Sequence, residues 1–503
     1  MTSWRKITRL LIVMLVALPG LGQGSERSSA ASLQQTANPN EATVQFQNGA
    51  VTLVGTLLTP ASVGPHPAVV IIHGARPNER GPYRRFATDV FVQHGVAVLI
   101  YDKRGYGDSS GDADTASLYD LADDAAAAVR YLQSRAEIDP TRIGLQGDSQ
   151  AGWIIPLVAT RTKDVAFLVM VAASAVSPAQ QEAFSIETRL RNAKLSERLV
   201  ATGRQARQLL DDYAGAVHEG RLPATAALQD VISLRTDHDP VPVLEQITQP
   251  VLIILGEADP FVPTKHSATV FDAALRKAGN RDYTIIVYPN ANHGIQVPTT
   301  NAQGETSLTY VEGYRATMTD WVVAHGRGTA TASNGIQGAV ADESAVFSQS
   351  GRYGKPSWYG TATVQLLLIV VFAVVFGGAT VGWIGSAIVR RKRPNPTLPA
   401  PRGTRPARLV GIIASTLNLL LLLGVVGLIA VLLLSGDEVV ISGLFNVLAI
   451  LALLAIVFNV AMAAFVILLW QRRSWSLAGR LSYSLVAVVA LLFVSFLNYW
   501  NLL

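Results

Sequence analysis

The chain has 503 residues, which is more than one hydrophobic core usually supports, so two or more structural units are expected. Of these residues 50% are hydrophobic and only 15% are charged, which excludes a disordered chain and suggests membrane segments. The chain has no cysteine, which excludes disulfide bonds, thiolate metal sites and a cysteine nucleophile. The net charge of +5 would indicate nucleic-acid binding only if the basic residues gathered on one surface.

The chain opens with three basic residues followed by an almost unbroken apolar run from Leu10 to Leu18 and then by small residues. This run is too short to cross a bilayer comfortably, so residues 1–24 are expected to be an export signal, with an uncleaved anchor as the alternative. Both interpretations place the following residues outside the cytoplasm. Residues 25–42 have no periodicity and are expected to be a flexible leader.

Short apolar runs alternate with helix-length stretches over residues 43–325. The first two runs are joined by Asn48-Gly49, which predicts a β-hairpin because this dipeptide accepts the positive φ angles of a tight turn. The alternation predicts an α/β fold with a mostly parallel sheet and helices on both faces. An insertion at about 178–243 shows helical periodicity. The predicted strands are 43–46, 51–57, 68–72, 96–100, 143–145, 165–171, 251–255 and 284–287.

Ser149 follows the predicted strand 143–145 and precedes a helix-compatible stretch that begins at Trp153. The intervening Gly147-Asp148-Ser149-Gln150-Ala151 has the G-x-S-x-A form of a nucleophile elbow. A sharp strand-to-helix turn holds the serine in strained backbone geometry, and only small residues two positions to either side avoid a clash. The strand before the motif and the helix after it make Ser149 a candidate nucleophile.

A serine hydroxyl needs a base to remove its proton, and the base needs an acid that fixes its tautomer. Strand 251–255 leads to Asp259, and strand 284–287 leads to His293. The chain order Ser149, Asp259, His293, each after its own strand, is the order that an α/β-hydrolase requires. Glu257 is an alternative acid.

Strand 68–72 leads into His73-Gly74-Ala75. A His-Gly turn at this position lets a backbone N–H group face the serine, so the amides of Ala75 and Gln150 are candidates for an oxyanion hole. His73 itself is expected to be structural. The glycine-rich stretch 101–111 lacks the lysine-serine pair of a phosphate-binding P-loop, and we interpret it as a loop that buttresses the site.

Taken together, these motifs resemble the α/β-hydrolase superfamily, in particular its exported bacterial esterase and serine-peptidase-like members. The resemblance implies Ser149 as nucleophile, His293 as base and Asp259 as its acid partner. It also implies that the insertion at about 178–243 is a helical cap over the nucleophile. No cofactor or metal is expected. Ala151 departs from the commoner glycine and fits sterically. The motifs stand at His73-Gly74, Tyr101–Gly111, Gly147–Gly152 and Asp239–Leu252.

Six basic residues of the insertion are expected to form mostly a solvated face, with attraction of an acidic substrate as the alternative. These residues are Arg189, Arg191, Lys194, Arg198, Arg204 and Arg207.

After a linker at 326–360, the segment 361–503 contains four apolar runs long enough to cross a bilayer as helices. The predicted helices are about 364–389, 409–434, 439–470 and 481–500. Four asparagines interrupt them, and we interpret these as forming helix-to-helix hydrogen bonds, with a transport path as the alternative. They are Asn418, Asn446, Asn459 and Asn498.

The positions of the charges explain the net charge of +5. The segment 364–503 carries +8, residues 1–24 carry +3, and residues 25–363 therefore carry −6. Nucleic-acid binding loses its support, because the large soluble segment is acidic. All ten basic residues of 364–503 lie in the loops after the first and third predicted helices. The positive-inside rule makes those loops cytoplasmic and puts the soluble domain on the periplasmic or extracellular side, in agreement with the predicted signal.

The sequence therefore predicts a multi-pass membrane protein whose extracytoplasmic domain is a serine hydrolase acting on a small-molecule or short acyl substrate. Ester hydrolysis is the leading reaction, because no peptide-binding domain is visible, and a serine peptidase is the alternative. A CoA thioesterase is disfavoured, because its substrate is cytosolic. A receptor that uses the hydrolase fold only to bind a ligand is the second alternative.

Overall fold

The computed structural model describes residues 40–75, 78–113, 116–218, 220–223, 238–301, 303–338, 357–392, 404–434 and 438–503. The predicted signal, most of the predicted leader and the middle of the predicted linker lie outside these residues, as do Arg393 and Arg402 of the first basic loop. The described residues form two compact units. Residues up to Ser185 and from 238 to 338 form the hydrolase unit, and Ile186–Pro223 with the residues from 357 onward form the membrane unit.

The hydrolase unit is built on a nine-stranded sheet in the order β1-β2-β4-β3-β5-β6-β7-β8-β11. The two pairings β1–β2 and β2–β4 are antiparallel, and every other neighbouring pair is parallel. The predicted hairpin is confirmed, with Gly49 at a φ of 58° in its turn. The strands are β1 (Asn40–Asn48), β2 (Val51–Thr59), β3 (His66–Ile72), β4 (Ala97–Tyr101), β5 (Ile138–Asp148), β6 (Phe167–Val171), β7 (Val251–Gly256), β8 (Tyr283–Tyr288) and β11 (Asn334–Gln337).

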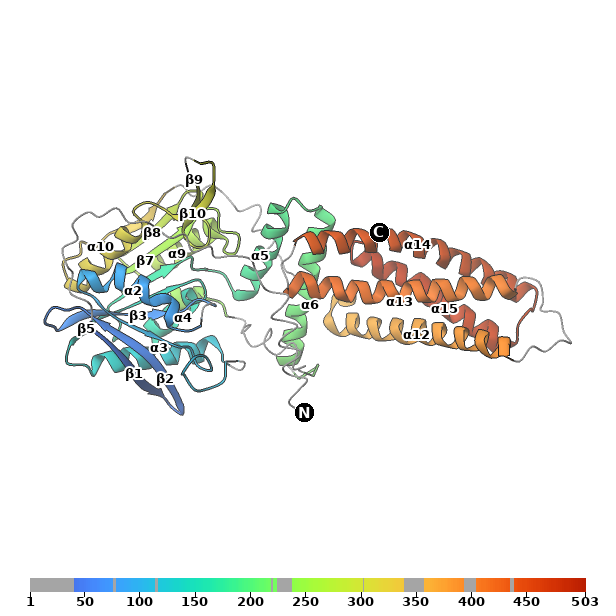
Figure 1. Ribbon diagram of the computed structural model, residues 1–503, viewed down its shortest axis with the longest axis horizontal. Helices are drawn as coiled ribbons and strands as arrows, with labels where there is room; N and C mark the ends of the chain where they lie inside the picture. Colours follow the sequence, from blue (N-terminus) through green and yellow to red (C-terminus); the bar gives the residue numbers. More distant parts are fainter. Residues whose placement is uncertain are drawn as a thin grey trace. The chain divides into compact units, whose positions relative to one another are not determined.

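Helices cover both faces of this sheet, so the predicted α/β layering is confirmed (Figure 1). Successive strand residues point to opposite faces. Val70 therefore joins the core cluster with α3 (Leu118–Gln133), α4 (Ala151–Arg161) and α9 (Thr264–Lys277). Its neighbour Val69 joins the cluster with α2 (Arg84–Val90) and α10 (Tyr314–Arg327). Short helical segments occur at η1 (Gly81–Tyr83), η2 (Val92–His94) and α8 (Val241–Leu244).

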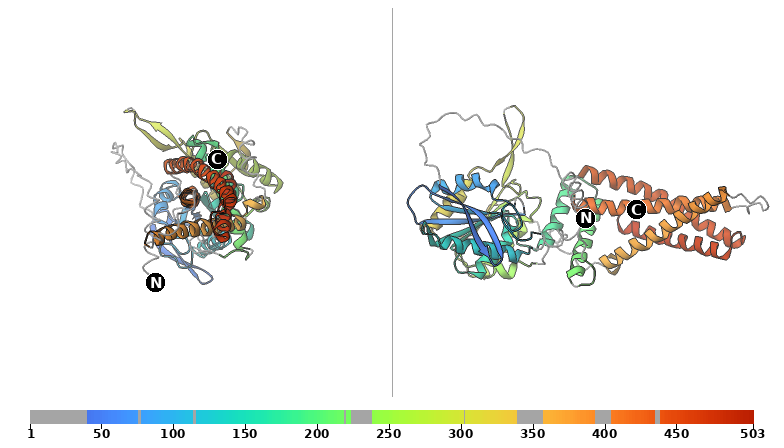
Figure 2. Two further views of the ribbon diagram at one scale, coloured as in Figure 1. Left: turned by 90° about the vertical axis from the view of Figure 1, so that its right-hand side faces the viewer. Right: turned by 60° about the horizontal axis from the view of Figure 1, so that its bottom comes forward.

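A second, two-stranded sheet pairs β9 (Gln296–Thr300) with β10 (Thr306–Tyr310), directly after the segment that carries His293. Figure 2 shows this hairpin extending away from the large sheet. Its threonine side chains bond across the strands, with Thr299 Oγ1 2.6 Å from Thr309 Oγ1. The sequence did not predict this hairpin, because its strands are mostly exposed and polar and carry no alternating apolar pattern.

The membrane unit contains four long helices, α12 (Ala362–Lys392), α13 (Thr404–Leu434), α14 (Glu438–Gln471) and α15 (Leu477–Tyr499), preceded by the short η3 (Trp358–Gly360). Each holds a segment long and apolar enough to cross a membrane, as predicted. Aromatic side chains pack α12 against α15, with the rings of Phe372 and Phe493 centred 5.0 Å apart. The structure therefore supplies an all-α region after the hydrolase unit.

Residues of the predicted cap occur in both units. Helix α5 (Pro178–Asn192) begins in the hydrolase unit, whereas α6 (Glu197–His218) belongs wholly to the membrane unit. Thr202 of α6 donates a hydrogen bond to the backbone oxygen of Trp500 at 3.0 Å, and Asp212 accepts one from the amide of Ala362 at 2.7 Å. The apolar side of α6 joins the core of the four long helices through Leu199, Val200 and Ala206. This insertion helix is thus a structural part of the membrane unit.

Three of the six basic residues of the insertion are paired with acidic ones, so the expected solvated face is wrong for part of this set. Glu187 is 1% exposed at its side chain and pairs with Arg191 at 2.7 Å and with Arg204 at 3.0 Å. Arg207 is buried, and its Nε lies 2.9 Å from Asp211 Oδ2. A buried guanidinium needs such a partner, because desolvation of an unpaired charge is costly.

Two of the four asparagines in the long helices bond across helices. Asn418 Nδ2 of α13 donates to Asn459 Oδ1 of α14 at 2.9 Å, and Asn459 Nδ2 donates to the backbone oxygen of Ala490 in α15 at 3.3 Å. Both asparagines are fully buried. The predicted helix-to-helix hydrogen bonds are therefore confirmed for this pair, whereas Asn446 and Asn498 are exposed.

Candidate active site

Ser149 lies in a sharp turn between β5 and α4. Its φ angle is 54°, in the left-handed region that non-glycine residues rarely occupy. The amide of Ser149 donates to the backbone oxygen of Val171 at the end of β6, at 2.8 Å. The turn thus stores backbone strain at one residue and anchors that residue to the neighbouring strand.

The small residues around Ser149 allow this turn to close. A Cβ added to Gly147 would lie 2.4 Å from the Cβ of Ala151 and 2.5 Å from the backbone oxygen of Ile72. A Cβ added to Gly152 would lie 2.5 Å from the Cβ of Ala173. The steric requirement read from the sequence therefore has a physical basis, and Ala151 itself fits fully buried.

Asp259 and His293, which follow β7 and β8, form a direct hydrogen bond. His293 Nδ1 lies 2.6 Å from Asp259 Oδ2, and the carboxylate is fully buried. The second carboxylate oxygen accepts the amides of Phe261 at 2.8 Å and Val262 at 3.0 Å. Because an ionised carboxylate only accepts hydrogen bonds, the proton of the neutral imidazole sits on Nδ1 and Nε2 is left as the basic atom.

The surroundings of His293 favour its charged form. Burial alone would lower the pKa of the imidazole, but the hydrogen bond and charge of Asp259 and the charge of Asp148 outweigh it and raise the pKa above 6.5. A base with a raised pKa accepts a proton more readily from a hydroxyl group. Glu257, the alternative acid, instead accepts the amide of Asn290 at 3.1 Å and makes no hydrogen bond to His293 among the described residues.

Asp148, the residue before Ser149, lies near enough to His293 for the charges of the two side chains to act on each other. Within the described structure the Ser149 hydroxyl makes no hydrogen bond to the imidazole. Such contacts are often long without substrate and shorten when substrate binds.

The two amides expected to bind an oxyanion belong to Ala75, after β3, and Gln150, before α4. Neither amide donates a hydrogen bond to another group in the part of the chain that the structure describes. Gly74 lies against the neighbouring carboxylate, and a Cβ there would meet Asp148 Oδ2 at 2.7 Å. The glycine therefore permits the close approach of the two strand ends.

His73 packs as a structural residue at the end of β3. Its ring stacks on Tyr83 with centroids 4.5 Å apart and lies 6.1 Å from the ring of Tyr101. Burial, and secondarily the positive charge of Lys103, lowers the pKa of His73 to about 3. The imidazole therefore stays neutral near pH 7, in keeping with the structural role expected for it.

The glycine-rich loop after β4 is held by the carboxylate of Asp102. Asp102 accepts the amides of Arg80 at 2.8 Å and Asp108 at 3.0 Å, and it also pairs with the Arg80 guanidinium. Gly107 has a φ of 52°, and a Cβ there would meet the Asp102 carboxylate. These contacts hold the loop in place beside the site, in the buttressing role interpreted from the sequence.

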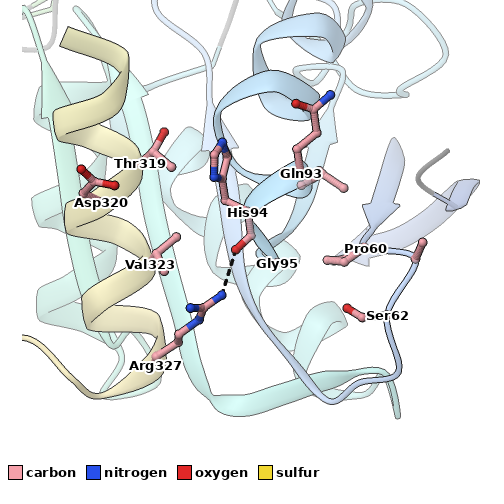
Figure 3. A pocket seen from close by; sticks show the side chains of 11 residues that line it. Pro60, Ser62, Gln93, His94, Gly95, Thr319, Asp320, Val323 and Arg327 are labelled. Atoms are coloured by element: carbon pink, nitrogen blue, oxygen red, sulfur yellow. Dashed lines mark hydrogen bonds between the residues drawn. The ribbon is translucent and has the colours of Figure 1, made fainter. Parts of the chain in front are cut away.

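A pocket of about 500 Å³ lies at the opposite end of the sheet (Figure 3). It is bounded by the segments after β2 and before β4 and by α10, where Arg327 donates to the backbone oxygen of His94 at 3.3 Å. Parallel strands place their carboxyl ends at one edge, and Ser149, Asp259 and His293 all follow such ends. None of these three residues lines the pocket.

Sequence reasoning missed three groups that surround the expected site. Tyr83 donates to Asp148 Oδ1 at 3.3 Å, and the ring of Phe261 lies edge-on to His293 with centroids 5.2 Å apart. Lys103, two residues beyond β4, is buried. The signal for Lys103 was available, since it stands just after the carboxyl end of a strand, whereas nothing in the sequence places Tyr83.

Comparisons with known proteins point to hydrolases. Residues 126–316 match the family described as BAAT / Acyl-CoA thioester hydrolase C terminal, a range that holds Ser149, Asp259 and His293 and ends before the four long helices. Esterase EstD of Thermotoga maritima is 25% identical over 248 residues, covering 48% of this chain and 57% of that protein. The mitochondrial acyl-coenzyme A thioesterase 2 of Mus musculus is 24% identical over 243 residues, covering 48% of each.

The chain thus spans about half the length of these two curated relatives. Among solved structures, an esterase of Pyrococcus furiosus overlaps 58% of this chain and 91% of that chain, with 16% identity and a TM-score of 0.39. The fold assignment itself rests on the sheet order, the sharp strand-to-helix turn at Ser149 and the helices on both faces.

Proposed function

Because the chain belongs to the α/β-hydrolase superfamily, we propose that it is a serine hydrolase that cleaves carboxylic esters through an acyl-enzyme on Ser149. The observation that carries this proposal is the His293–Asp259 hydrogen bond of 2.6 Å, made at the same sheet edge where Ser149 occupies a strained turn. A fold alone does not define an activity, so the proposal rests on these three side chains.

In the proposed reaction, Ser149 Oγ attacks the acyl carbon while His293 Nε2 takes the hydroxyl proton. The carbonyl oxygen becomes negative and is bound by the amides of Ala75 and Gln150. The protonated imidazole then gives its proton to the leaving alcohol, and the ester C–O bond breaks. A water molecule, deprotonated by the same Nε2, attacks the acyl carbon of the acyl-enzyme. The bond from this carbon to Ser149 Oγ then breaks, the imidazolium returns its proton to Oγ, and the carboxylic acid is released. Asp259 keeps the imidazole oriented and stabilises its positive charge in both halves.

We further propose that the four long helices cross the cell membrane and place the hydrolase unit on the periplasmic or extracellular side. The support is the excess of basic residues in the two loops after the first and third helices. Of these residues, Arg472 and Arg473 follow α14 and are exposed.

Thioester hydrolysis is a second candidate, because the matched family and the mouse relative are described by acyl-CoA thioesters. The chemistry of Ser149 would be the same, with a thiol as the leaving group. The proposed orientation argues against it, since acyl-CoA is a cytosolic compound.

The reaction can be tested with the full chain in detergent and a panel of p-nitrophenyl esters, an acyl-CoA and an aminoacyl anilide. We expect hydrolysis of the esters that Ser149→Ala abolishes. Preferential cleavage of the acyl-CoA would favour the second candidate, and preferential cleavage of the anilide would indicate a peptidase. Absence of hydrolysis from the whole panel would favour a ligand-binding role.

The orientation can be tested by single cysteines, because the natural chain has none. Ser62 of the hydrolase unit and Gln471 at the end of α14 are both exposed. In spheroplasts, a membrane-impermeant maleimide should label Ser62→Cys directly and Gln471→Cys only after the membrane is opened. The reverse pattern would refute the proposed orientation.

A further inference from the structure

Lys103 is a buried cation beside the site with no role in the proposed reaction. It stands two residues beyond β4 and is 7% exposed. Its Nζ donates to the backbone oxygen of Gly74 and to Gln150 Oε1, the latter at 2.9 Å. Burying an ammonium group is costly unless its hydrogen bonds are satisfied, and lysine is rarely buried as deeply as this. Both acceptors belong to segments that carry a proposed oxyanion amide.

The first contact fixes the direction of the Ala75 amide. The carbonyl of Gly74 and the N–H of Ala75 belong to one peptide group, which is trans. In a planar trans peptide these two groups point in opposite directions. An ammonium group that holds the Gly74 oxygen therefore sets where the Ala75 N–H points, and it polarises that N–H as a donor.

The second contact acts on the other amide. Gln150 is 7% exposed, and its side-chain oxygen is held by the same Nζ. The backbone N–H of Gln150 is the second proposed oxyanion donor. One ammonium group thus connects the two segments whose relative position defines the oxyanion site, and its charge is of the sign that stabilises a developing oxyanion.

We propose that Lys103 is a positioning residue that orients the Ala75 and Gln150 amides toward the oxyanion of the transition state. This inference rests on the proposed function, because without acyl transfer at Ser149 there is no oxyanion to bind. Lys103 acts through the two amides and does not itself touch the substrate.

The charges that face Lys103 come from two neighbouring strand ends. Asp148, at the end of β5, attracts the ammonium group, and His73, after β3, is neutral near pH 7. Burial lowers the pKa of Lys103 to about 8, against the opposing effect of Asp148. Activity should therefore decline on the alkaline side as Lys103 loses its proton and releases one of its two acceptors.

The test uses the full chain in detergent with p-nitrophenyl butyrate as substrate and an octyl trifluoromethyl ketone, which forms a tetrahedral oxyanion adduct with a serine. Lys103→Met should lower kcat about 10- to 100-fold with KM changed less than about threefold. It should lower the affinity for the ketone by a factor similar to the loss in kcat. Lys103→Arg keeps a permanent charge, so it should recover part of the loss and remove the alkaline decline. Lys277→Met, at an exposed lysine paired with Glu245, is the matched control.

A Lys103→Met protein with wild-type kcat and ketone affinity, or with a change in KM alone, would overturn the inference. If Lys103→Met does not fold, an alkaline decline that persists unchanged in Lys103→Arg would overturn it equally. The proposed function fails separately: in that case the wild-type chain itself neither hydrolyses the ester nor forms the ketone adduct.

Discussion

The two units of this protein place apolar and polar residues in opposite ways. In the hydrolase unit, sheet residues such as Val70 and Leu145 are fully buried, and the polar groups of the site collect where strands end. In the membrane unit, Leu423 is 61% exposed while Asn418 is fully buried. Water surrounds the first unit, whereas hydrocarbon would surround the second, where polar side chains gain most from partners inside the bundle. The same residue type therefore indicates a core in one unit and a surface in the other.

A second difference concerns connectivity. Helix α6 is inserted in the sequence of the hydrolase unit, yet it packs on the ends of the long helices through Thr202 and Asp212. The membrane unit is therefore more than an anchor added at the carboxyl end, because it includes part of the segment that was predicted from the sequence as a cap.

The largest effect on activity is expected from substitution of Asp259, the acid partner of His293 in the hydrolase unit. Asp259→Asn should lower kcat about 10⁴-fold, because an amide at this position stabilises the wrong tautomer and no longer supports the imidazolium. Glu257→Gln is the matched control, since Glu257 bonds to the Asn290 amide and not to His293. Steady-state ester hydrolysis measures both. Equal losses in the two variants would show that the acid has been assigned wrongly.

The packing around Ser149 can be disturbed without removing a side chain of the proposed reaction. Gly147→Ala should destabilise the hydrolase unit by about 2 kcal/mol, because the new Cβ would clash with Ala151 and with the backbone of Ile72. Gly81→Ala should be nearly neutral, since a Cβ there meets no atom within 4 Å. Thermal unfolding of the full chain compares them, and an unchanged transition in Gly147→Ala would contradict the tight turn described here.

The membrane unit should respond to loss of a polar pair. Asn418→Leu should destabilise the bundle by about 1 kcal/mol, because Asn459 loses one partner inside the bundle. Adding Asn459→Leu should restore much of the stability, since no unpaired amide then remains. Asn446→Leu, at an exposed position, is the control. Unfolding in detergent measures the series, and equal effects at Asn418 and Asn446 would contradict an interior role.

The smallest effect expected is a shift with pH. His293 acts as a base only when neutral, and Asp259 and Asp148 raise its pKa above 6.5 against the effect of burial. The acidic limb of kcat/KM should therefore be centred above pH 6.5, with activity increasing as the imidazole loses its proton. Asp148→Asn should move this limb to lower pH, because one of the two negative charges is removed. A pH profile of both proteins is the measurement, and an unmoved limb would argue against the influence of Asp148.

The eight main strands, the four long helices and the sheet class were predicted from the sequence, because continuous apolar runs indicate buried strands or membrane-length helices. The sequence also singled out Ser149, Asp259 and His293 from their places after strands, and the structure shows that two of them bond. The hairpin β9–β10 was not predicted, since its exposed, threonine-rich strands have no apolar face. The packing of α6 in the membrane unit was not predicted either, because an apolar helical stripe fits a membrane bundle as readily as a hydrolase cap.

The most direct test of the central claim is covalent labelling of the full chain with a fluorophosphonate, followed by mass spectrometry of its peptides. We predict one phosphonyl group, on Ser149, lost in Ser149→Ala and strongly slowed in Asp259→Asn. A wild-type chain that stays unlabelled, or a Ser149→Ala chain that is labelled to the same extent, would contradict the account.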